Sequence, residues 1–276
     1  MIPAPFDYQR ASSVDEALAA LAQHGEDAKL LAGGHSLLPL MKLRLAMPAV
    51  RVDIGRIPDL SYVRGEGGEV RIGALTRHHD LATSDLAREQ VPLLAQVAGQ
   101  IGDPQVRHRG TVGGSVAHGD PASDLPAALL ALRGTLVARG PGGERTIPAD
   151  DFFTGFLETA LAPDEVLTEI RVPAVPGVGW AFEKFQRRAQ DWAIVGVAAV
   201  LADGSGGPGV GLVNMGSLPL RAAGVEDALR SGSAAAEAAA RAAEGTEPPE
   251  DLNASPEYRR HLVEVLTRRA LETAGA

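Results

Sequence analysis

The chain has 276 residues, contains no cysteine and carries a formal net charge of −9 at pH 7. Without thiols it cannot form a disulfide framework, a cysteine-ligated zinc site, an iron–sulfur cluster or a cysteine nucleophile. The acidic balance disfavours nucleic acid and anionic membranes as partners, and no apolar run approaches the ~18 residues that span a bilayer. The N-terminus lacks the basic and apolar regions of a signal peptide, so we expect a cytoplasmic protein.

The first 75 residues predict one helix and several short strands. Ser13 and Glu16 form a capping box, and the apolar spacing that follows predicts a helix over 14–24. Strands are expected at 29–32, 50–54, 60–63 and 70–74, and the glycine-rich turn at 65–68 joins the last two as a hairpin.

From residue 77 onward, helices alternate with glycine-rich segments and hairpins. Helical periodicity spans 77–100, and its candidate core residues are Leu81, Leu86, Leu93, Leu94, Val97 and Ile101. Residues 111–119 are rich in glycine, and a helix is expected at 125–132, with Pro126 in its first turn. A hairpin at 136–139 and 145–147 and a strand at 166–172 follow.

A domain boundary is expected near 173–179, because two prolines and a glycine interrupt the periodicity there. It divides the chain into residues 1–175 and 176–276. Beyond it, strands at 181–185, 193–202 and 210–213 are expected to form one small sheet, with helices near 222–231 and 256–273. The stretch 233–251 predicts a helix followed by a surface loop.

Two glycine pairs are the strongest functional signal. Gly33-Gly34 follow a strand directly and precede His35 and Ser36, whereas Gly113-Gly114 lie between Thr111 and Ser115. A glycine pair can expose successive backbone amides, and such a row of donors binds anions. Two such segments suit a pyrophosphate held from both sides. The alternative is that both are ordinary turns.

Other nucleotide and metal motifs have weak support. The phosphate loop of NTPases is missing, and the formal G-x-G-x-x-G at 204–209 lies between two expected strands, which indicates a hairpin turn. The histidines have no zinc spacing, and the adjacent His78 and His79 cannot face together on a helix. One interpretation of Asp120 and Asp124 is that they are a pair of metal ligands. The alternatives are a loop-shaping Asp120 and an Asp124 that lies at a helix N-terminus or accepts hydrogen bonds from ligand hydroxyls.

The motifs Ala32-Gly33-Gly34-His35-Ser36-Leu37-Leu38-Pro39 and Thr111-Val112-Gly113-Gly114 resemble the two FAD-pyrophosphate motifs of the flavin subunits of molybdenum hydroxylases. The chain is most similar to the FAD-binding medium subunits of aerobic carbon monoxide dehydrogenases. The resemblance covers essentially the whole chain, including Met41-Lys42-x-Arg44-Leu45-Ala46, Asp103-Pro104-Gln105, Gly119-Asp120-Pro121 and Pro256-Glu257-Tyr258-Arg259. It implies an α+β fold: a two-lobed FAD-binding domain of the vanillyl-alcohol-oxidase type, with lobes at about 1–55 and 56–175, and a small α/β C-terminal domain.

The resemblance also implies which residues bind FAD. Leu30 through Leu37 would wrap one side of the pyrophosphate, and Thr111 through Ser115 would wrap the other. The implied cofactor-binding set is Leu30, Leu31, Ala32, Gly33, Gly34, His35, Ser36, Leu37, Ile101, Thr111, Gly113, Gly114, Ser115, Asp124, Leu167, Lys184 and Trp192. Ile101 is expected to pack on the flavin ring. No catalytic or metal-ligating residue is expected.

Three of these positions carry alternatives. Most relatives have Asn where this chain has Ser115, and a hydroxyl keeps a donor and an acceptor but loses the reach of the amide. Trp192 either shields the flavin ring or is a core or interface tryptophan. Lys184 either lies near the flavin or the phosphates or is a solvated surface charge.

The implied function is electron transfer in an oxidoreductase complex of the carbon monoxide dehydrogenase and xanthine dehydrogenase type. In such enzymes a large molybdopterin subunit oxidises the substrate, and electrons pass through the [2Fe-2S] clusters of a small subunit to FAD and an external acceptor. The missing cysteines agree, because any cluster must then lie in a partner. A dimer of heterotrimers is expected, with at most indirect membrane contact. The alternatives are a free-standing flavin-dependent oxidoreductase of the same fold, for which no acid–base residue stands out, and a non-enzymatic module without cofactor.

Overall fold

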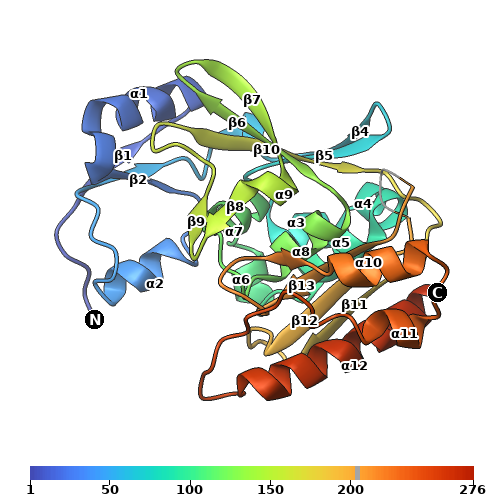
Figure 1. Cartoon of the computed structure of the whole chain (residues 1–276). Coiled ribbons are helices and arrows are strands. Elements are labelled where there is room, and N and C mark those ends of the chain that lie inside the picture. Colours follow the sequence, from blue (N-terminus) through green and yellow to red (C-terminus); the bar gives the residue numbers. More distant parts are fainter. Residues whose placement is uncertain (203–205) are drawn as a thin grey trace.

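A parallel three-stranded sheet begins the chain in the computed structural model, which describes residues 1–202 and 206–276 (Figure 1). Its strands are β1 (Asp7–Arg10), β2 (Ala28–Leu31) and β3 (Val50–Asp53), in the order β1-β3-β2. Helix α1 (Val14–His24) covers one face and buries Ala17, Ala20 and Leu21 in a cluster with Val50 and Val52. The capping box is confirmed in part: Ser13 Oγ accepts from the Glu16 amide at 3.2 Å, whereas the Glu16 carboxylate accepts from the Ser12 amide at 2.7 Å.

The other face of this sheet carries helix α2 (Leu37–Lys42). Because side chains alternate along a strand, Arg51 of β3 points away from Val50 and Val52. Its side chain is 1% exposed, its guanidinium lies over the Phe6 ring, and its Nε donates to Met41 Sδ at 3.0 Å. Helix α2 is therefore fastened to the sheet through a buried cation.

The central part of the chain builds an antiparallel sheet with helices packed beneath it (Figure 1). Its strands, in spatial order, are β4 (Val63–Glu66), β5 (Glu69–Gly73), β10 (Val166–Pro173), β6 (Thr135–Gly140) and β7 (Gly143–Pro148). A separate ribbon pairs β8 (Phe153–Gly155) with β9 (Glu158–Thr159). The helices are α3 (His78–Thr83), α4 (Asp85–Gln90), α5 (Pro92–Gly99), α6 (Pro104–Arg107), α7 (Val112–His118), α8 (Asp124–Ala131) and α9 (Ala149–Phe152).

One expectation is corrected in this region, and two segments are defined more closely. The periodic segment 77–100 forms three helices, α3, α4 and α5, because Ser84 caps a new helix and Pro92 begins another. The glycine-rich segment 111–119 contains helix α7. The strand expected at 60–63 begins at Val63, since Pro58–Leu60 form a 3-10 turn. Of the candidate core residues, Leu81, Leu93, Leu94 and Val97 are buried, whereas Leu86 and Ile101 are half-buried.

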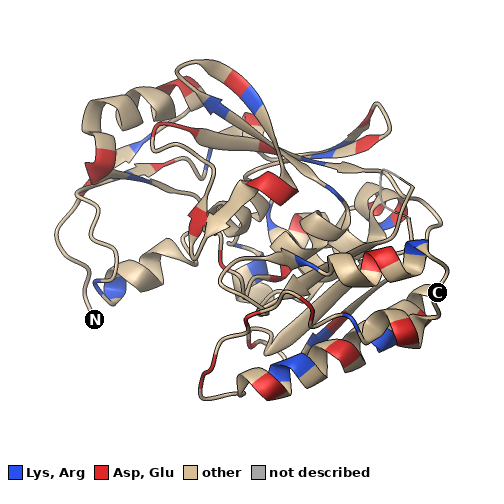
Figure 2. Cartoon of the chain, in the orientation of Figure 1, with Lys and Arg blue, Asp and Glu red and all other residues tan. Residues whose placement is uncertain are grey.

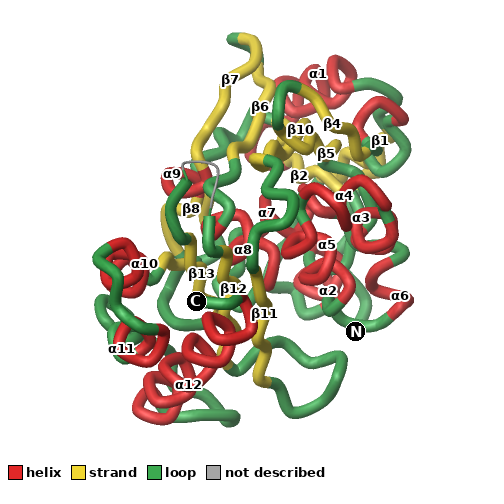
Figure 3. Tube along the Cα trace, turned by 90° about the vertical axis from the view of Figure 1, so that its right-hand side faces the viewer, coloured by secondary structure: helices red, strands yellow, loops and turns green. Residues whose placement is uncertain are grey.

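The last sheet is antiparallel, with β11 (Trp180–Phe185), β12 (Val195–Val200), β13 (Gly209–Val213) and β14 (Leu220–Arg221) in consecutive order. Helices α10 (Ala223–Arg230), α11 (Ala235–Ala239) and α12 (Pro256–Ala274) lie on one side of it, and α5 and α8 lie on the other (Figure 3). The helix expected within 233–251 is only the short α11. The glycine motif at 204–209 begins outside the described residues, but β12 and β13 pair antiparallel across it, as a hairpin requires.

Two glycines let this sheet lie directly on α8. A Cβ at Gly209 or Gly211 would collide with the carbonyl oxygens of Ala131 and Ala127. The central and last parts of the chain therefore share one continuous core. In the described part of the chain, no helix combines the length and apolar character needed to cross a membrane.

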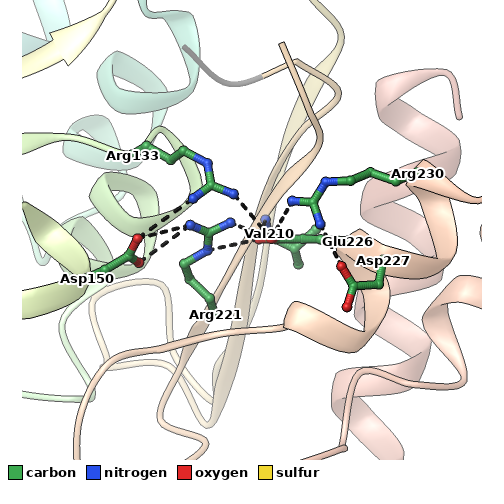
Figure 4. Close-up of polar contacts among 7 residues, drawn as sticks. All are labelled: Arg133, Asp150, Val210, Arg221, Glu226, Asp227 and Arg230. Atoms are coloured by element: carbon green, nitrogen blue, oxygen red, sulfur yellow. Dashed lines mark hydrogen bonds and ion pairs between the residues drawn. The ribbon is translucent and has the colours of Figure 1, made fainter. Parts of the chain in front are cut away.

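A buried carboxylate strengthens the same junction (Figure 4). Glu226 of α10 exposes 3% of its side chain and accepts hydrogen bonds from the Val210 amide at 2.9 Å and from Arg221 Nε at 3.0 Å. Arg133, which follows α8, lies 3.8 Å from the same carboxylate. Arg133 and Arg221 also reach Asp150 of α9, at 3.8 and 3.2 Å. These charges connect α8 and α9 to β14 and α10.

Replacing Glu226 by alanine is expected to lower the free energy of unfolding by about 3–5 kcal/mol, because the largely buried Arg221 loses its main carboxylate partner. Asp227→Ala is the matched control: this neighbouring carboxylate is exposed and pairs with Arg230 at the surface, so about 1 kcal/mol or less is expected. Urea unfolding followed by circular dichroism measures both variants. Equal losses would contradict the role of Glu226.

Candidate functional site

A cavity of about 940 Å³ lies between the loop after β2, the segment from α6 to α8, and the β11–β12 connection. It is at the upper end of the ~300–1,000 Å³ typical of small-molecule and cofactor sites. All of the predicted cofactor-binding residues except Leu31 line it. Leu31 lines a separate cavity of about 150 Å³. Residues from positions 30 to 192 are thus gathered around one space.

The loop after β2 presents a row of free donors to the cavity. Among the described residues, the amides of Gly33, Gly34, His35 and Ser36 donate to no protein acceptor. Gly34 has a φ of 83°, a left-handed conformation that only glycine adopts at little cost. A left-handed residue within such a row turns neighbouring N–H groups to the same side and forms an anion-binding nest.

Gly33 also brings this loop against the second glycine segment. A Cβ at Gly33 would collide with the Arg109 carbonyl oxygen and lie 2.9 Å from the Gly110 Cα. The two motifs, far apart in sequence, are therefore in contact through their backbones.

The second glycine pair is not a second row of free amides. The amides of residues 112–115 all donate within the protein, to carbonyl oxygens of Thr76 and Ala74 and to the hydroxyl and carbonyl of Thr111. A Cβ at Gly113 would lie 2.5 Å from that of Ala74. The prediction of a nest is wrong here, because these amides already have acceptors within the protein. Gly113 instead allows close packing of α7 against the turn after β5.

The remaining polar and apolar wall comes from several elements. Ser115 of α7 is half-buried at the cavity, Leu167 of β10 is buried, and Ile101 before α6 is half-buried. Trp192 lies on the β11–β12 connection and is 61% exposed. That exposure excludes a core role for Trp192 and leaves the shielding and interface alternatives.

A buried ion pair crosses the cavity wall. Lys184 Nζ of β11 lies 2.6 Å from Oδ2 of Asp124, the first residue of α8, and the two side chains are 3% and 5% exposed. Lys184 is therefore not the solvated surface charge given as an alternative. Burial raises the pKa of the Asp124 carboxyl, and the nearby Lys184 ammonium opposes that shift only in part. Asp124 Oδ1 is buried without a hydrogen-bond partner among the described residues.

Asp120 has the loop-shaping role that was one of its alternatives. Its Oδ1 accepts a hydrogen bond from the Ala122 amide at 2.8 Å. Burial also raises the pKa of this carboxyl. Within residues 1–202 and 206–276, no three histidine, aspartate or glutamate side chains gather as a metal-binding group.

One cavity residue, His78 of α3, was missed by sequence reasoning. Its buried imidazole lies behind Gly110, where a Cβ would be 2.7 Å from its Cδ2, and its Nδ1 has no hydrogen-bond partner in the described chain. Burial, helped by the nearby His35 and Arg77, lowers the pKa of His78 to about 4. The imidazole is therefore neutral at pH 7. The pair His78-His79 was visible in the sequence, but nothing in it marks which member points inward.

Acidification is expected to destabilise the protein through His78. Between pH 6.5 and about 4 the unfolded chain binds a proton at this residue that the folded chain does not. The free energy of unfolding should therefore fall by up to roughly 3 kcal/mol across this window, with no contribution above it. Urea unfolding at a series of pH values measures the slope, which His78→Gln should reduce. The exposed His261→Gln is the control, and equal slopes in both variants would contradict the assignment.

The chain matches known protein families over nearly its whole length. Residues 4–175 match the family described as the FAD binding domain in molybdopterin dehydrogenase, and residues 180–274 match the CO dehydrogenase flavoprotein C-terminal domain. The chain is 45% identical to the carbon monoxide dehydrogenase medium chain of Hydrogenophaga pseudoflava and 42% identical to that of Afipia carboxidovorans, across 100% of this chain and 99% of each relative. The solved carbon monoxide dehydrogenase of Hydrogenophaga pseudoflava, in a form lacking the Mo-pyranopterin moiety, superimposes with a TM-score of 0.94 at 47% identity, covering 99% of this chain and 98% of that one.

Proposed function

The chain belongs to the family of FAD-binding medium subunits of molybdenum hydroxylases, and from this premise we propose that it binds FAD in the large cavity and passes electrons through it. The electrons come from the iron–sulfur clusters of a partner subunit and leave to an external acceptor. This is the work of one subunit of an oxidoreductase complex of the carbon monoxide dehydrogenase and xanthine dehydrogenase type.

The observation that carries the proposal is the row of free amides at Gly33–Ser36 on the wall of a cavity of about 940 Å³. A pyrophosphate needs several convergent donors, and a net charge of −9 makes local donors essential. The buried Asp124 Oδ1 supports the same fit, because an unpartnered carboxylate oxygen suits a ligand hydroxyl. The residues present therefore fit a dinucleotide such as FAD.

Bound FAD supplies the redox chemistry, and the protein supplies binding, orientation and exclusion of water. We assign the pyrophosphate to the amides of Gly33–Ser36, with the Ser115 hydroxyl on the other side. We assign a ribose or ribityl hydroxyl to Asp124, which Lys184 holds in place at 2.6 Å. Ile101 and Leu167 supply apolar packing, and Trp192 covers the open side of the cavity. Leu30, Ala32, Leu37, Thr111, Gly113 and Gly114 shape the wall, and Leu31 supports the loop from the opposite cavity.

The proposed partners are a small [2Fe-2S] subunit and a large molybdopterin subunit, assembled as a dimer of heterotrimers. The chain spans nearly the full length of medium chains that bear that name, which supports a subunit over a free-standing flavoenzyme. The substrate is oxidised on the large subunit, so the FAD site does not select it. We further propose a cytoplasmic location, which cell fractionation tests directly.

We propose the domain division at residues 1–175 and 176–276, with lobes of about 1–55 and 56–175 in the first domain. Separate hydrophobic clusters support it: one centres on β1–β3 and α1, and another fills the space between β11–β14 and α10–α12. The largest cluster joins the parts, so the domains are expected to unfold together.

The experiment that tests the function is co-expression with the small and large subunits of the source genome, with a purification tag on this chain. FAD together with iron–sulfur absorbance in the visible spectrum would support both the cofactor and the partners. FAD on a lone chain with nothing co-purified would favour the free-standing flavoenzyme. A partner-bound complex without flavin would contradict the assignment of the cavity.

A further inference from the structure

A second, smaller cavity lies behind the glycine loop that follows β2, and we call it the rear cavity. Its volume is about 150 Å³. Ala32 and Gly33 line both this cavity and the large one, so the loop separates the two spaces. Sites for nucleotides and other cofactors typically measure ~300–1,000 Å³. The rear cavity therefore has room for a small ion and not for a nucleotide.

The lining of the rear cavity is basic. Its arginines are Arg56, which follows β3, Arg77, which precedes α3, and Arg109, which follows α6. Among the described residues, Asp53 is the one carboxylate on this lining. Elsewhere, as along α12, basic and acidic residues are interspersed (Figure 2). Three cations against one anion are exceptional in a chain with a net charge of −9, and such a local excess attracts a counter-ion.

The carboxylate of Asp53 already has other partners. Its Oδ1 accepts a hydrogen bond from the Gly55 amide at 2.8 Å, and its Oδ2 accepts one from the Tyr8 hydroxyl at 2.5 Å. The hydrogen bond to Asp53 raises the pKa of Tyr8, and the Arg10 and Arg56 guanidiniums act in the opposite direction. The Arg56 guanidinium is thus near this carboxylate without being bonded to it.

The three arginines have many unused donors. Arg77 is half-buried, and it donates from Nη1 to the Arg109 carbonyl oxygen and from Nη2 to the Gly55 carbonyl oxygen, the latter at 3.5 Å. The side chains of Arg56 and Arg109 are exposed and donate to no acceptor in the described part of the chain. Because each guanidinium carries five N–H donors, most of the donors at this cavity are free to bind a ligand.

The guanidiniums also repel one another. Burial, together with the nearby Arg109 guanidinium, lowers the pKa of Arg77. An anion between these groups would remove that repulsion. Arginine forks match the oxygens of phosphate and carboxylate groups. A tetrahedral oxyanion presents oxygens in several directions, whereas a carboxylate presents only two. Cations from three separate segments therefore favour the tetrahedral ion.

We propose that the rear cavity binds a small tetrahedral oxyanion of the phosphate class through Arg56, Arg77 and Arg109. This site is separate from the large cavity and goes beyond the proposed function. The ion would join the segments after β3, before α3 and after α6. Two of them contact the glycine loop: a Cβ at Gly33 would collide with the Arg109 carbonyl oxygen, and one at Gly55 would lie 3.0 Å from the Ala32 carbonyl oxygen. The ion would thereby stabilise the frame behind the loop.

Calorimetric titration of the FAD-loaded chain with sodium phosphate tests the site, with sodium chloride at the same ionic strength as the reference. Arg56→Gln/Arg109→Gln removes two charges whose side chains bond to nothing else in the described chain, and it should weaken phosphate binding at least ~10-fold. Arg260→Gln/Arg269→Gln removes the same charge at exposed positions of α12 and should bind as the wild type does. Tighter binding of glycerol 3-phosphate than of inorganic phosphate would identify a phosphate ester as the ligand, and the reverse order the free ion.

Urea unfolding provides a second readout. Because a ligand of the folded state stabilises it, phosphate should raise the urea midpoint of the wild type above its value in chloride, and it should not do so for Arg56→Gln/Arg109→Gln. In chloride this variant should be no less stable than the wild type, since it loses only repulsion.

Three outcomes would overturn the site. They are equal responses of the wild type to phosphate and chloride, phosphate binding by Arg56→Gln/Arg109→Gln at wild-type strength, and a large loss of stability of that variant in chloride, which would make the arginines structural. None of them depends on the proposed function. In a chain without flavin, phosphate could also reach the amides of Gly33–Ser36, and the variant would then remove only the binding at the rear cavity.

Discussion

Gly33→Ala is expected to reduce the FAD affinity of the purified protein at least tenfold. A Cβ at this position would collide with the Arg109 carbonyl oxygen and press on the Gly110 Cα, so the backbone of one segment must move. Overpacking of this kind costs about 1–3 kcal/mol, and 1.4 kcal/mol corresponds to a factor of ten in affinity. The row of amides at Gly33–Ser36 then no longer faces the cavity as a unit.

Flavin content per chain, from the visible spectrum, and FAD titration of the apoprotein measure this effect. The control is Gly142→Ala in the β6–β7 turn, where a Cβ would meet no atom within 4 Å. Circular dichroism of the apoprotein shows whether the variant is folded. A folded Gly33→Ala protein with wild-type affinity for FAD would show that the contact between the two motifs is irrelevant to binding.

Lys184→Met is expected to lower the free energy of unfolding of the apoprotein by about 3–5 kcal/mol. The reason is that Asp124, 5% exposed, would lose its cation while remaining buried. The pKa of Asp124 is already raised by burial in the presence of Lys184, so without it the carboxyl is expected to take up a proton at a still higher pH. Urea unfolding above pH 7 measures the loss.

The double variant Asp124→Asn/Lys184→Met separates stability from binding. Replacing both members of a buried ion pair is often nearly neutral, so most of the lost stability should return. FAD affinity should not return, because the amide introduced at position 124 would lack the carboxylate that we assign to a ligand hydroxyl. A double variant that recovers both properties would mean that the pair has no part in binding. One that recovers neither would mean that the two single substitutions act independently.

Local sequence signals predicted much of the fold because they act over a few residues. Ser13 caps α1, Pro126 lies in the first turn of α8, and the turns at 67–68 and 141–142 join hairpins, as expected. In each case the residue satisfies or frees backbone groups of its own neighbours, so no distant contact is needed.

The sequence pattern misled where distant contacts decide the structure. The glycine pair at 113–114 predicted a second row of free backbone amides. In the structure, the Thr111 cap and the close packing of Gly113 on Ala74 make α7 a helix. The same packing uses the amides that were expected to bind an anion, which is why the second nest is absent from the described site.

The sequence by itself showed the family motifs and the absence of cysteine. It also predicted the α+β fold and the glycine loop after β2. Only the tertiary structure decided that Lys184 is buried against Asp124, that His78 rather than His79 faces the cavity, and that Trp192 is exposed at its mouth. The physical reason is that periodicity reports which face of an element is apolar, whereas the pKa and partners of a polar side chain depend on elements packed against it from elsewhere in the chain.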